Sequence, residues 1–482
     1  MTIRDRLPRW FRPVAYLSYN AFTMIGAVVA VSSAFTVVGF WIYDFTTGGP
    51  INPYIGLIFI LILPGIFVIG LAMMPVGVVW HRHKLRLAGT LPDEYPRMDF
   101  NRPLFRQAAA WMAGLTVCNA IILSVGSYRS VEYMDSANFC GQTCHTVMQP
   151  EYTAYLNSPH QRVSCVQCHI GPGAGWFVKS KLSGVRQVVA VTLHTYDHPI
   201  PSPVEQLRPA RETCEQCHWP LMFTGDRLIV RKKYSDDEKN TPLTTVLLMK
   251  IGGHSSGGAV GIHGRHLDLN SRVRYIATDR QRQTIPRVSY LDDGGKAVEF
   301  ISSDAKPTAQ QLAAGESRSM DCMDCHNRPA HTFQAPERAV DQAMSQGLIS
   351  ADLPFIKKQA TLVLKAKYSD RGDAGKRIAA ALRDFYSASY PDAFRDRRPA
   401  INAAIQEVQA IYLRNVFPDM NVNWGTYPNN LGHADFPGCF RCHDGSHASS
   451  DGRVISNDCD ACHALLAVEE KDPKVLGDLG MK

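Results

Sequence analysis

Six clusters of cysteine and histidine occupy the last three-quarters of this chain. Five read Cys-x-x-Cys-His, and the first has one extra residue between its cysteines. Numbered as motifs one to six, they are Cys140/Cys144/His145, Cys165/Cys168/His169, Cys214/Cys217/His218, Cys322/Cys325/His326, Cys439/Cys442/His443 and Cys459/Cys462/His463. Two thiols at this spacing followed directly by a histidine form the attachment signature of c-type haem. The sequence therefore predicts six covalently attached haem c groups, with each motif histidine ligating an iron.

The cysteine count supports this prediction over a zinc site. The motifs use all but one of the 13 cysteines, leaving Cys118 in an apolar run. In zinc ribbons the cysteine pairs associate two by two, whereas here a histidine follows every pair. Haem attachment through thiols also implies an oxidising, extracytoplasmic compartment.

Each iron can take a second, distal ligand, which sets its redox potential and decides whether it can bind a substrate. Nine histidines after residue 128 lie outside the motifs, which is enough for six irons. We expect distal ligands mainly among those close to motifs: His160, His331, His433 and His447, with His194 and His198 as further candidates. His263 and His266 stand apart from every motif and are less favoured, and Met148 is an alternative ligand for the first iron.

Three apolar stretches, at about 16–43, 53–80 and 107–127, are each long enough to span a membrane. Basic residues cluster before the first stretch and between the second and third, whereas the loop at 44–53 has none. By the positive-inside rule, the chain enters from the cytoplasm and everything after about residue 128 is extracytoplasmic. We therefore expect a multi-pass protein of the bacterial inner (cytoplasmic) membrane with its haem region in the periplasm.

Composition and pattern set the expected fold. Residues 1–127 hold ten Lys and Arg against five Asp and Glu, so the net charge of +7 lies mostly beside the membrane and indicates no nucleic-acid surface. Strand-like runs lie between 228 and 301, a stretch without cysteine that has a hairpin signal at 292–295, and 335–418 has helical periodicity. The predicted fold is an α-helical membrane anchor of three transmembrane helices plus a mixed α+β multihaem region with little regular structure around the haems. The expected domains are the anchor (1–127), a trihaem domain (128–220), a β-rich insert (221–320) and a helical C-terminal trihaem domain (321–482).

The segment from Phe139 to Arg186 resembles the NapC/NirT family of membrane-anchored quinol-oxidising cytochromes in its first two motifs, in Tyr152, Tyr155 and His160, and in Lys179 and Lys181. Motifs three, four and five, with their flanking residues, extend the resemblance to ImcH-type inner-membrane cytochromes of metal-reducing bacteria. This chain departs from the resembling proteins in three ways. NapC-like proteins have one anchor, and their first motif is unexpanded with Met two residues after its His. ImcH-like proteins have seven haems, whereas this chain has six motifs. The resemblance implies a quinol site near the first haem, with Asp197 at the position of a membrane-proximal acid.

The expected function is electron transfer from menaquinol or ubiquinol in the membrane quinone pool to periplasmic c-type cytochromes. Oxidation of a quinol releases protons, so its site needs acceptors near the lipid bilayer. The candidate residues for this site are Glu132, Asp135, Asp197, Lys179, Lys181 and Arg186, although the cations are equally suited to phospholipid headgroups. The alternatives are a terminal reductase of a nitrogen or sulfur oxyanion, which would need an open iron, and a haem-based redox sensor. The sequence leaves open whether the β-rich insert is a docking surface or a scaffold.

Overall fold

The chain forms two compact units, Met1–Thr143 and Cys144–Lys482, and motif one crosses their boundary. The computed structural model describes residues 12–18, 20–47, 63–92, isolated positions between 103 and 129, and 132–143, 145–170, 174–204, 207–218, 225–255, 258–267, 272–292 and 294–481.

The first unit contains two long apolar helices, α2 (Ala21–Thr47) and α4 (Leu63–Leu87), after a short helix α1 (Arg12–Leu17). Ala21–Ile42 and Leu63–Leu87 are long and apolar enough to cross a bilayer. The two helices approach closely through glycine, since a Cβ added to Gly26 would lie 2.8 Å from the Gly70 carbonyl oxygen. Small residues at such a crossing are typical of helix pairs in membranes.

These helices agree with the first two predicted spans only in part. Helix α2 covers most of 16–43, and α4 begins within 53–80 and continues to Leu87. Residues 53–62 and most of the third span, 107–127, lie outside the described residues. The third membrane helix therefore stays a prediction.

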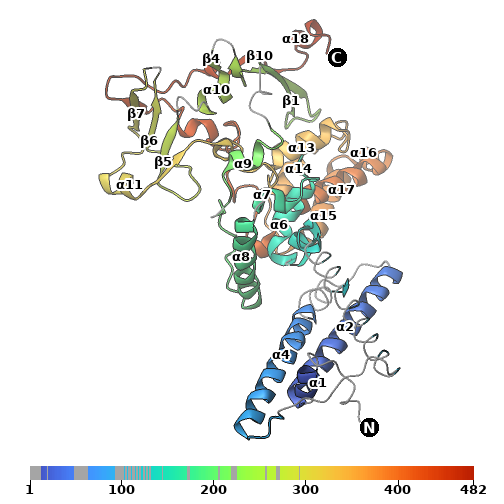
Figure 1. Cartoon of the computed structure of the whole chain (residues 1–482). Helices are drawn as coiled ribbons and strands as arrows, with labels where there is room; N and C mark the ends of the chain where they lie inside the picture. Colours follow the sequence, from blue (N-terminus) through green and yellow to red (C-terminus); the bar gives the residue numbers. More distant parts are fainter. Residues whose placement is uncertain are drawn as a thin grey trace. The chain divides into compact units, whose positions relative to one another are not determined.

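The second unit begins with short helices that carry or flank haem motifs (Figure 1). They are α6 (His145–Leu156), α7 (Cys165–His169), α8 (Ala174–Thr192) and α9 (Ala210–Cys214). Just before them, the first unit ends on a π-helical turn, η3 (Phe139–Thr143). A π turn joins residues i and i+5, which is the spacing from Cys140 to His145, so the expanded motif fits a wider helical turn.

Two antiparallel sheets follow, and both are completed by strands from the far C-terminus. The first has the order β1 (Arg227–Tyr234), β2 (Pro242–Met249), β10 (His463–Glu470). The second has the order β8 (Glu316–Ser319), β5 (Arg274–Ala277), β6 (Arg287–Leu291), β7 (Ala297–Ser302), β9 (His447–Ser449). A small hairpin of β3 (Gly253–Ser255) and β4 (Gly258–Val260) leads into helix α10 (Gly261–Leu267), and α11 (Ala309–Ala314) precedes β8. The predicted strands and the hairpin between β6 and β7 are confirmed, but the sheets extend beyond residues 221–320.

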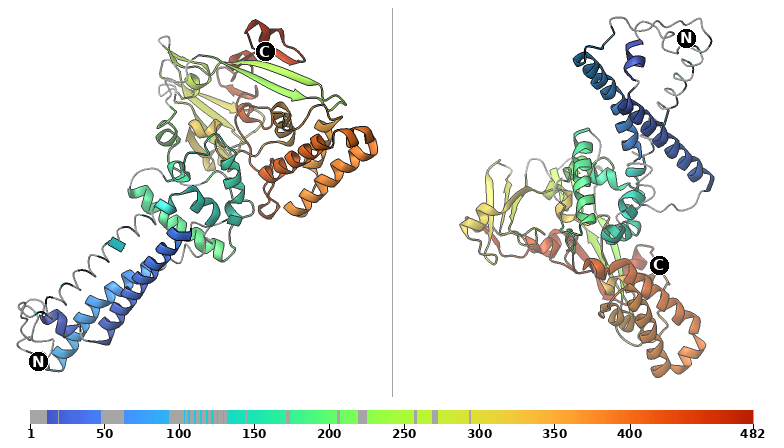
Figure 2. Two further views of the ribbon diagram at one scale, coloured as in Figure 1. Left: turned by 90° about the vertical axis from the view of Figure 1, so that its right-hand side faces the viewer. Right: turned by 90° about the horizontal axis from the view of Figure 1, so that it is seen from below.

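The main apolar core lies in a bundle of C-terminal helices, visible at the orange end of the chain in Figures 1 and 2. Its helices are α13 (Pro336–Ser345), α14 (Ile356–Lys365), α15 (Arg371–Ser389), α16 (Pro391–Asp396) and α17 (Arg398–Asn415). Local signals set their ends: Pro336 is the first residue of α13, and the Asp370 carboxylate caps α15 by accepting from Gly372 N and Asp373 N. The remaining short elements are α12 (Cys322–Cys325), η5 (Pro418–Met420), η6 (Gly438–Arg441), η7 (Cys459–Ala461) and α18 (Lys474–Asp478).

One buried ion pair makes this bundle sensitive to a single substitution. The Lys357 side chain is 3% exposed, and its Nζ donates to Asp341 Oδ1 at 2.6 Å. We expect Asp341→Ala to cost about 3–5 kcal/mol of unfolding free energy, because it leaves a buried ammonium without its counter-charge. Denaturant unfolding followed by circular dichroism measures this. The exposed pair of Lys365 and Glu337 provides the control, since Glu337→Ala should cost less than about 1 kcal/mol. Equal losses in both variants would contradict the prediction.

Candidate functional site

Each haem motif that the structure describes in full lies on a single turn of the backbone. In motifs three, four and five the histidine N–H donates to the carbonyl oxygen of the first cysteine, at 2.7, 2.8 and 3.0 Å respectively. This spacing places the first cysteine, the second cysteine and the histidine on neighbouring positions of one helix face. The turns are also capped locally, for example by Asp321 in motif four and Asp458 in motif six. The local sequence therefore presents both thiols and the imidazole together.

Cys217, the second expected attachment cysteine of motif three, lies outside the helix that carries the first. Helix α9 ends at Cys214, so Cys217 falls in the turn that follows, where its N–H donates to the Cys214 carbonyl oxygen at 3.1 Å. Cys217 is exposed, as are Cys168 and Cys459, whereas Cys214 is half-buried. Helices α7 and α9 are in contact, so motifs two and three lie close together. The backbone turn, and not burial, thus supports Cys217 as an attachment residue, and its thioether bond stays a prediction.

Five motif histidines lie opposite a second histidine from elsewhere in the chain. The ring centroids are separated by 5.9 Å in His160–His218, 6.2 Å in His169–His331, 6.4 Å in His263–His326, 5.8 Å in His266–His443 and 6.2 Å in His433–His463. A metal bonded to two imidazoles at about 2 Å on each side puts the ring centroids about 6 Å apart. The residues at motifs two to six thus fit a six-coordinate haem iron with two histidine ligands.

Hydrogen bonds hold several of these rings by their Nδ1 atoms. The Nδ1 atoms of His160, His331 and His266 lie 3.2, 3.0 and 2.7 Å from the carbonyl oxygens of Pro329, Glu151 and Ile262. The His443 Nδ1 lies 2.6 Å from the Ser456 carbonyl oxygen. A carbonyl partner at Nδ1 requires the proton there and leaves Nε2 as the metal-binding atom.

Burial favours the neutral form of several paired histidines, which is the form that metal ligation requires. It lowers the pKa of His169, His331 and His266, and facing histidines lower the pKa of His169 and His266 further. Burial also lowers the pKa of His263 and of its partner His326.

Three of the expected distal ligands are brought to motif histidines, but not always to the nearest motif in sequence. His160 faces motif three, His331 faces motif two, and His433 faces motif six. His447 has a different role from the expected one: its ring is fully buried, Nε2 lies 2.7 Å from the Ile285 carbonyl oxygen and Nδ1 3.0 Å from Asp444 Oδ1. With both ring nitrogens in hydrogen bonds, His447 is a structural residue at the start of β9.

The sequence favoured His263 and His266 less than the other candidates, yet they face motifs four and five. Their spacing of three residues was the available signal, since it places both rings on one face of a helix.

Consecutive motifs adjoin in chain order from motif two to motif six. The helices of motifs two and three, α7 and α9, are in contact, as are those of motifs three and four, α9 and α12. The Cys214 side chain lies beside Cys322 and lowers the pKa of the Cys322 thiol to about 7. Burial, together with the nearby Cys439 thiol, raises the pKa of Cys325 to about 12. Cys439 likewise lies beside Cys462, whose pKa is raised chiefly by burial. The attachment points therefore form one continuous row.

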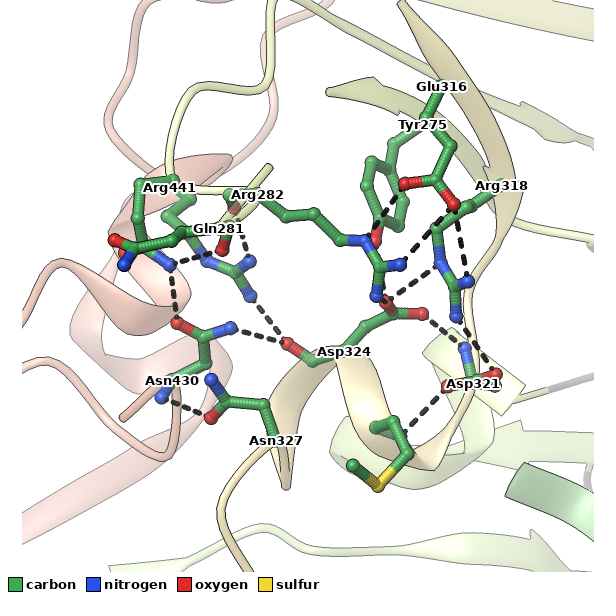
Figure 3. Close-up of polar contacts among 12 residues, drawn as sticks. Tyr275, Gln281, Arg282, Glu316, Arg318, Asp321, Asp324, Asn327, Asn430 and Arg441 are labelled. Atoms are coloured by element: carbon green, nitrogen blue, oxygen red, sulfur yellow. Dashed lines mark hydrogen bonds and ion pairs between the residues drawn. The ribbon is translucent and has the colours of Figure 1, made fainter. Parts of the chain in front are cut away.

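A buried polar network joins motif four to motif five (Figure 3). Asp324, between the cysteines of motif four, is 2% exposed and accepts from the Tyr275 hydroxyl at 2.5 Å and from Arg318 Nε at 3.3 Å. Arg441, between the cysteines of motif five, donates to the Asp324 carbonyl oxygen at 2.7 Å and to the Arg282 carbonyl oxygen at 2.8 Å. Burial beside Asp324 raises the pKa of Tyr275. The Arg441 side chain thus fixes the turn of motif five to the backbone of the turn of motif four.

A cavity of about 780 Å³ opens beside this network. Its lining comes from residues 202–204 and 207–210, from the Arg280–Arg282 turn, and from Asp321, Met323 and Asp324 of motif four. This volume is within the range of pockets that hold a cofactor. The cavity lies beside motif four, and its lining is rich in charged side chains such as Arg318 and Asp321.

The residues predicted for a quinol site fall on both units. Glu132, in the first unit, pairs with Arg129 at 2.7 Å. Lys181 and Arg186 lie on α8, and Asp197 and His198 follow its end. His198 Nδ1 lies 2.9 Å from the Asp419 carbonyl oxygen, and its ring stacks on Tyr196 at 4.7 Å. Met148 lies one turn after His145 on α6, while the side chain of His145 and the placement of Cys144 lie outside the described residues.

Comparison with known proteins finds similar c-type cytochromes. Residues 104–209 match the family described as NapC/NirT cytochrome c family, N-terminal region. Cytochrome c-type protein ImcH of Geobacter sulfurreducens is 43% identical over 459 residues, which cover 94% of this chain and 89% of that protein. Cytochrome c-type protein NrfH of Wolinella succinogenes is 33% identical over 103 residues, 21% of this chain and 58% of that protein. No solved structure matches the chain.

Proposed function

This chain belongs to the NapC/NirT family of membrane-anchored multihaem c-type cytochromes, and from that premise we propose that it oxidises menaquinol or ubiquinol and reduces a periplasmic c-type cytochrome. Each quinol gives up two electrons and two protons. The electrons leave one at a time to the acceptor cytochrome, and the protons pass to acidic side chains and water at the membrane surface. Six covalently held haems would supply the reversible uptake and release of single electrons.

The observation that carries this proposal is the set of facing histidine pairs at motifs two to six. With a histidine from each side, an iron held here would have no free position for a substrate, which would suit electron transfer. We accordingly assign His331 to motif two, His160 to motif three and His433 to motif six as distal ligands. Their pairing favours an electron-transfer protein over a terminal reductase of nitrogen or sulfur oxyanions.

The row of attachment points supports a direction of electron flow. Motif one directly follows the predicted third membrane span, so electrons from a membrane quinol enter there. From motif two onward each motif adjoins the next in chain order. The acceptor cytochrome therefore docks close to motif six, at the end of the row.

Helix α8 is suited to contact the lipid at the entry end. Val191 packs against a small core that includes Val147 of α6, so one side of the helix is held by the protein. Leu182, Val185 and Leu193, on the helix and just after it, are 64–68% exposed, with Arg186 beside them. An exposed apolar stripe flanked by basic residues is typical of a helix lying in the membrane interface. Lys181, Arg186, Asp197 and Glu132 are then the proposed quinol-site residues.

For the first iron, the ligand candidates are His198, His194 and Met148. His198 has its Nδ1 at a backbone carbonyl in the same manner as the paired distal histidines. Element η5, which supplies that carbonyl, contacts α6, which starts at His145. We therefore favour His198 as this ligand, with Asp197 next to it as a proton acceptor.

The proposed topology places the haem region in the periplasm. Lys84 and Arg86 are in the last turn of α4, as expected at a cytoplasmic end. Thioether attachment on the opposite side of a multi-pass inner-membrane anchor satisfies both this charge bias and the need for an oxidising compartment.

Anaerobic addition of a menaquinol analogue to the detergent-solubilised protein tests the function. We expect rapid reduction of the haem absorption bands, and we expect a quinone-site inhibitor to block it. Asp197→Asn should slow reduction by quinol about 100-fold, as the loss of a proton acceptor does, and leave reduction by dithionite unchanged. Asp236→Asn, an acid in the turn after β1, is the matched control. Failure of quinol to reduce the protein, with reoxidation of dithionite-reduced protein by nitrite or sulfite, would favour the terminal reductase.

A further inference from the structure

We infer that the short helix α10 supplies the distal iron ligands of two different haems, His263 for motif four and His266 for motif five. The His263 ring lies 6.4 Å from the His326 ring, and the His266 ring lies 5.8 Å from the His443 ring. Both distances match two imidazoles on opposite sides of one metal. The inference rests on the proposed haem attachment at these motifs, and it makes the β-rich insert part of the electron path.

Backbone hydrogen bonds hold the start of helix α10 at the end of strand β2. Ile262 N donates to the Lys250 carbonyl oxygen and His263 N to the Ile251 carbonyl oxygen, both at 2.9 Å. The helix starts at Gly261, where φ is +65° and an added Cβ would lie 2.6 Å from the Lys250 oxygen. Glycine alone permits this turn without strain, so the start of α10 and the direction of its histidines are fixed.

One helix can serve two irons here because motifs four and five are themselves joined. Residues three apart on a helix project from the same face, about one turn from each other. Opposite them, the Cys325 and Cys439 thiols are neighbours, and Arg441 of motif five donates to the Asp324 carbonyl oxygen of motif four. The His266 Nδ1 lies 2.7 Å from the Ile262 carbonyl oxygen of α10, which directs Nε2 toward motif five.

The same strand end also positions motif six. Lys250 N donates to the Cys462 carbonyl oxygen at 2.9 Å, and His463 pairs with Met249 at the start of β10. Strand β2 thus connects directly to motif six and, through α10, to motifs four and five. In this inference the insert acts as a scaffold that aligns the last three haem sites, which is one of the two roles that the sequence left open.

Carbon monoxide binding and electron paramagnetic resonance of the full-length haem protein test this inference. We expect His263→Ala and His266→Ala each to convert one low-spin haem to high-spin and, after dithionite reduction, to bind one more CO per chain than the unaltered protein. The double variant should bind two more. Thioether bonds keep the haems attached, so the haem content by mass spectrometry should not change. Arg265→Gln, on the same helix, should leave spin states and CO binding unchanged.

Methionine variants keep the test decisive if the alanine variants do not accumulate. Thioether ligation raises haem potential, so His263→Met and His266→Met should each raise the midpoint potential of a single haem in a spectroelectrochemical titration. Unchanged spin states and CO binding in the alanine variants, or unchanged potentials in the methionine variants, would overturn the inference. Electrons from quinol enter at the other end of the row, so the initial rate of reduction should be unchanged in the two single alanine variants and the two methionine variants. That rate reports separately on the proposed function.

Discussion

Produced without haem attachment, the chain is expected to keep the helical bundle 335–418 folded while the rest of the second unit loses its fixed structure. The bundle has a continuous core of buried residues that includes Val340, Leu353, Ile378 and Ile405. Elsewhere in the second unit the described apolar clusters are small, such as the one around Tyr275 and Val288. The facing histidines come from segments far apart in sequence, and a shared haem would tie each pair together.

Limited proteolysis followed by mass spectrometry measures this effect. When a bound group exists only in the folded state, its binding free energy becomes folding free energy, and apparent values of about 10 kcal/mol or more are known for structural metals. We expect one protease-resistant fragment covering the bundle in the haem-free chain, and a much larger one in the haem-loaded protein. Equal resistance of the two forms would show that protein contacts alone hold the haem region together.

The sequence predicted the parts of this molecule that depend on local pattern. The strands at 228–234 and 287–291 and the helices starting at Pro336 and near Ala400 follow from periodicity and end signals only a few residues long. The haem motifs are equally local, since a single turn sets both cysteines and the histidine. The same reasoning could not identify β10, because the run from His463 to Glu470 becomes a strand only by pairing with distant β2.

The histidine pairs depend on tertiary structure, so sequence distance was a poor guide to them. His160 lies just before motif two but faces motif three, and His331 follows motif four but faces motif two. His447 lies four residues after His443 and was expected as a ligand on that ground, but hydrogen bonds to Ile285 and Asp444 occupy its ring. Crossed pairing of this kind locks separate segments together, which a motif-by-motif interpretation does not anticipate.

Removal of motif four should divide the protein into two groups of haems that differ in their access to quinol. Helices α9 and α12, which carry motifs three and four, are in contact, and Cys325 lies beside Cys439, so motif four is the link between motifs three and five. In Cys322→Ser/Cys325→Ser we expect quinol to reduce the haems of motifs one to three promptly, while those of motifs five and six lag. Stopped-flow absorption with a menaquinol analogue resolves the two phases, and reduction of an added cytochrome c follows the slow phase.

The matched control removes the end of the row instead of its middle. In Cys459→Ser/Cys462→Ser the path from motif one to motif five is intact, so all remaining haems should be reduced in one prompt phase. The slow step in this variant should appear only at transfer to the added cytochrome, because the terminal site is missing. Prompt, complete reduction in both variants would mean that the C-terminal haems receive electrons by a second route, and that the order of attachment points does not determine the order of transfer.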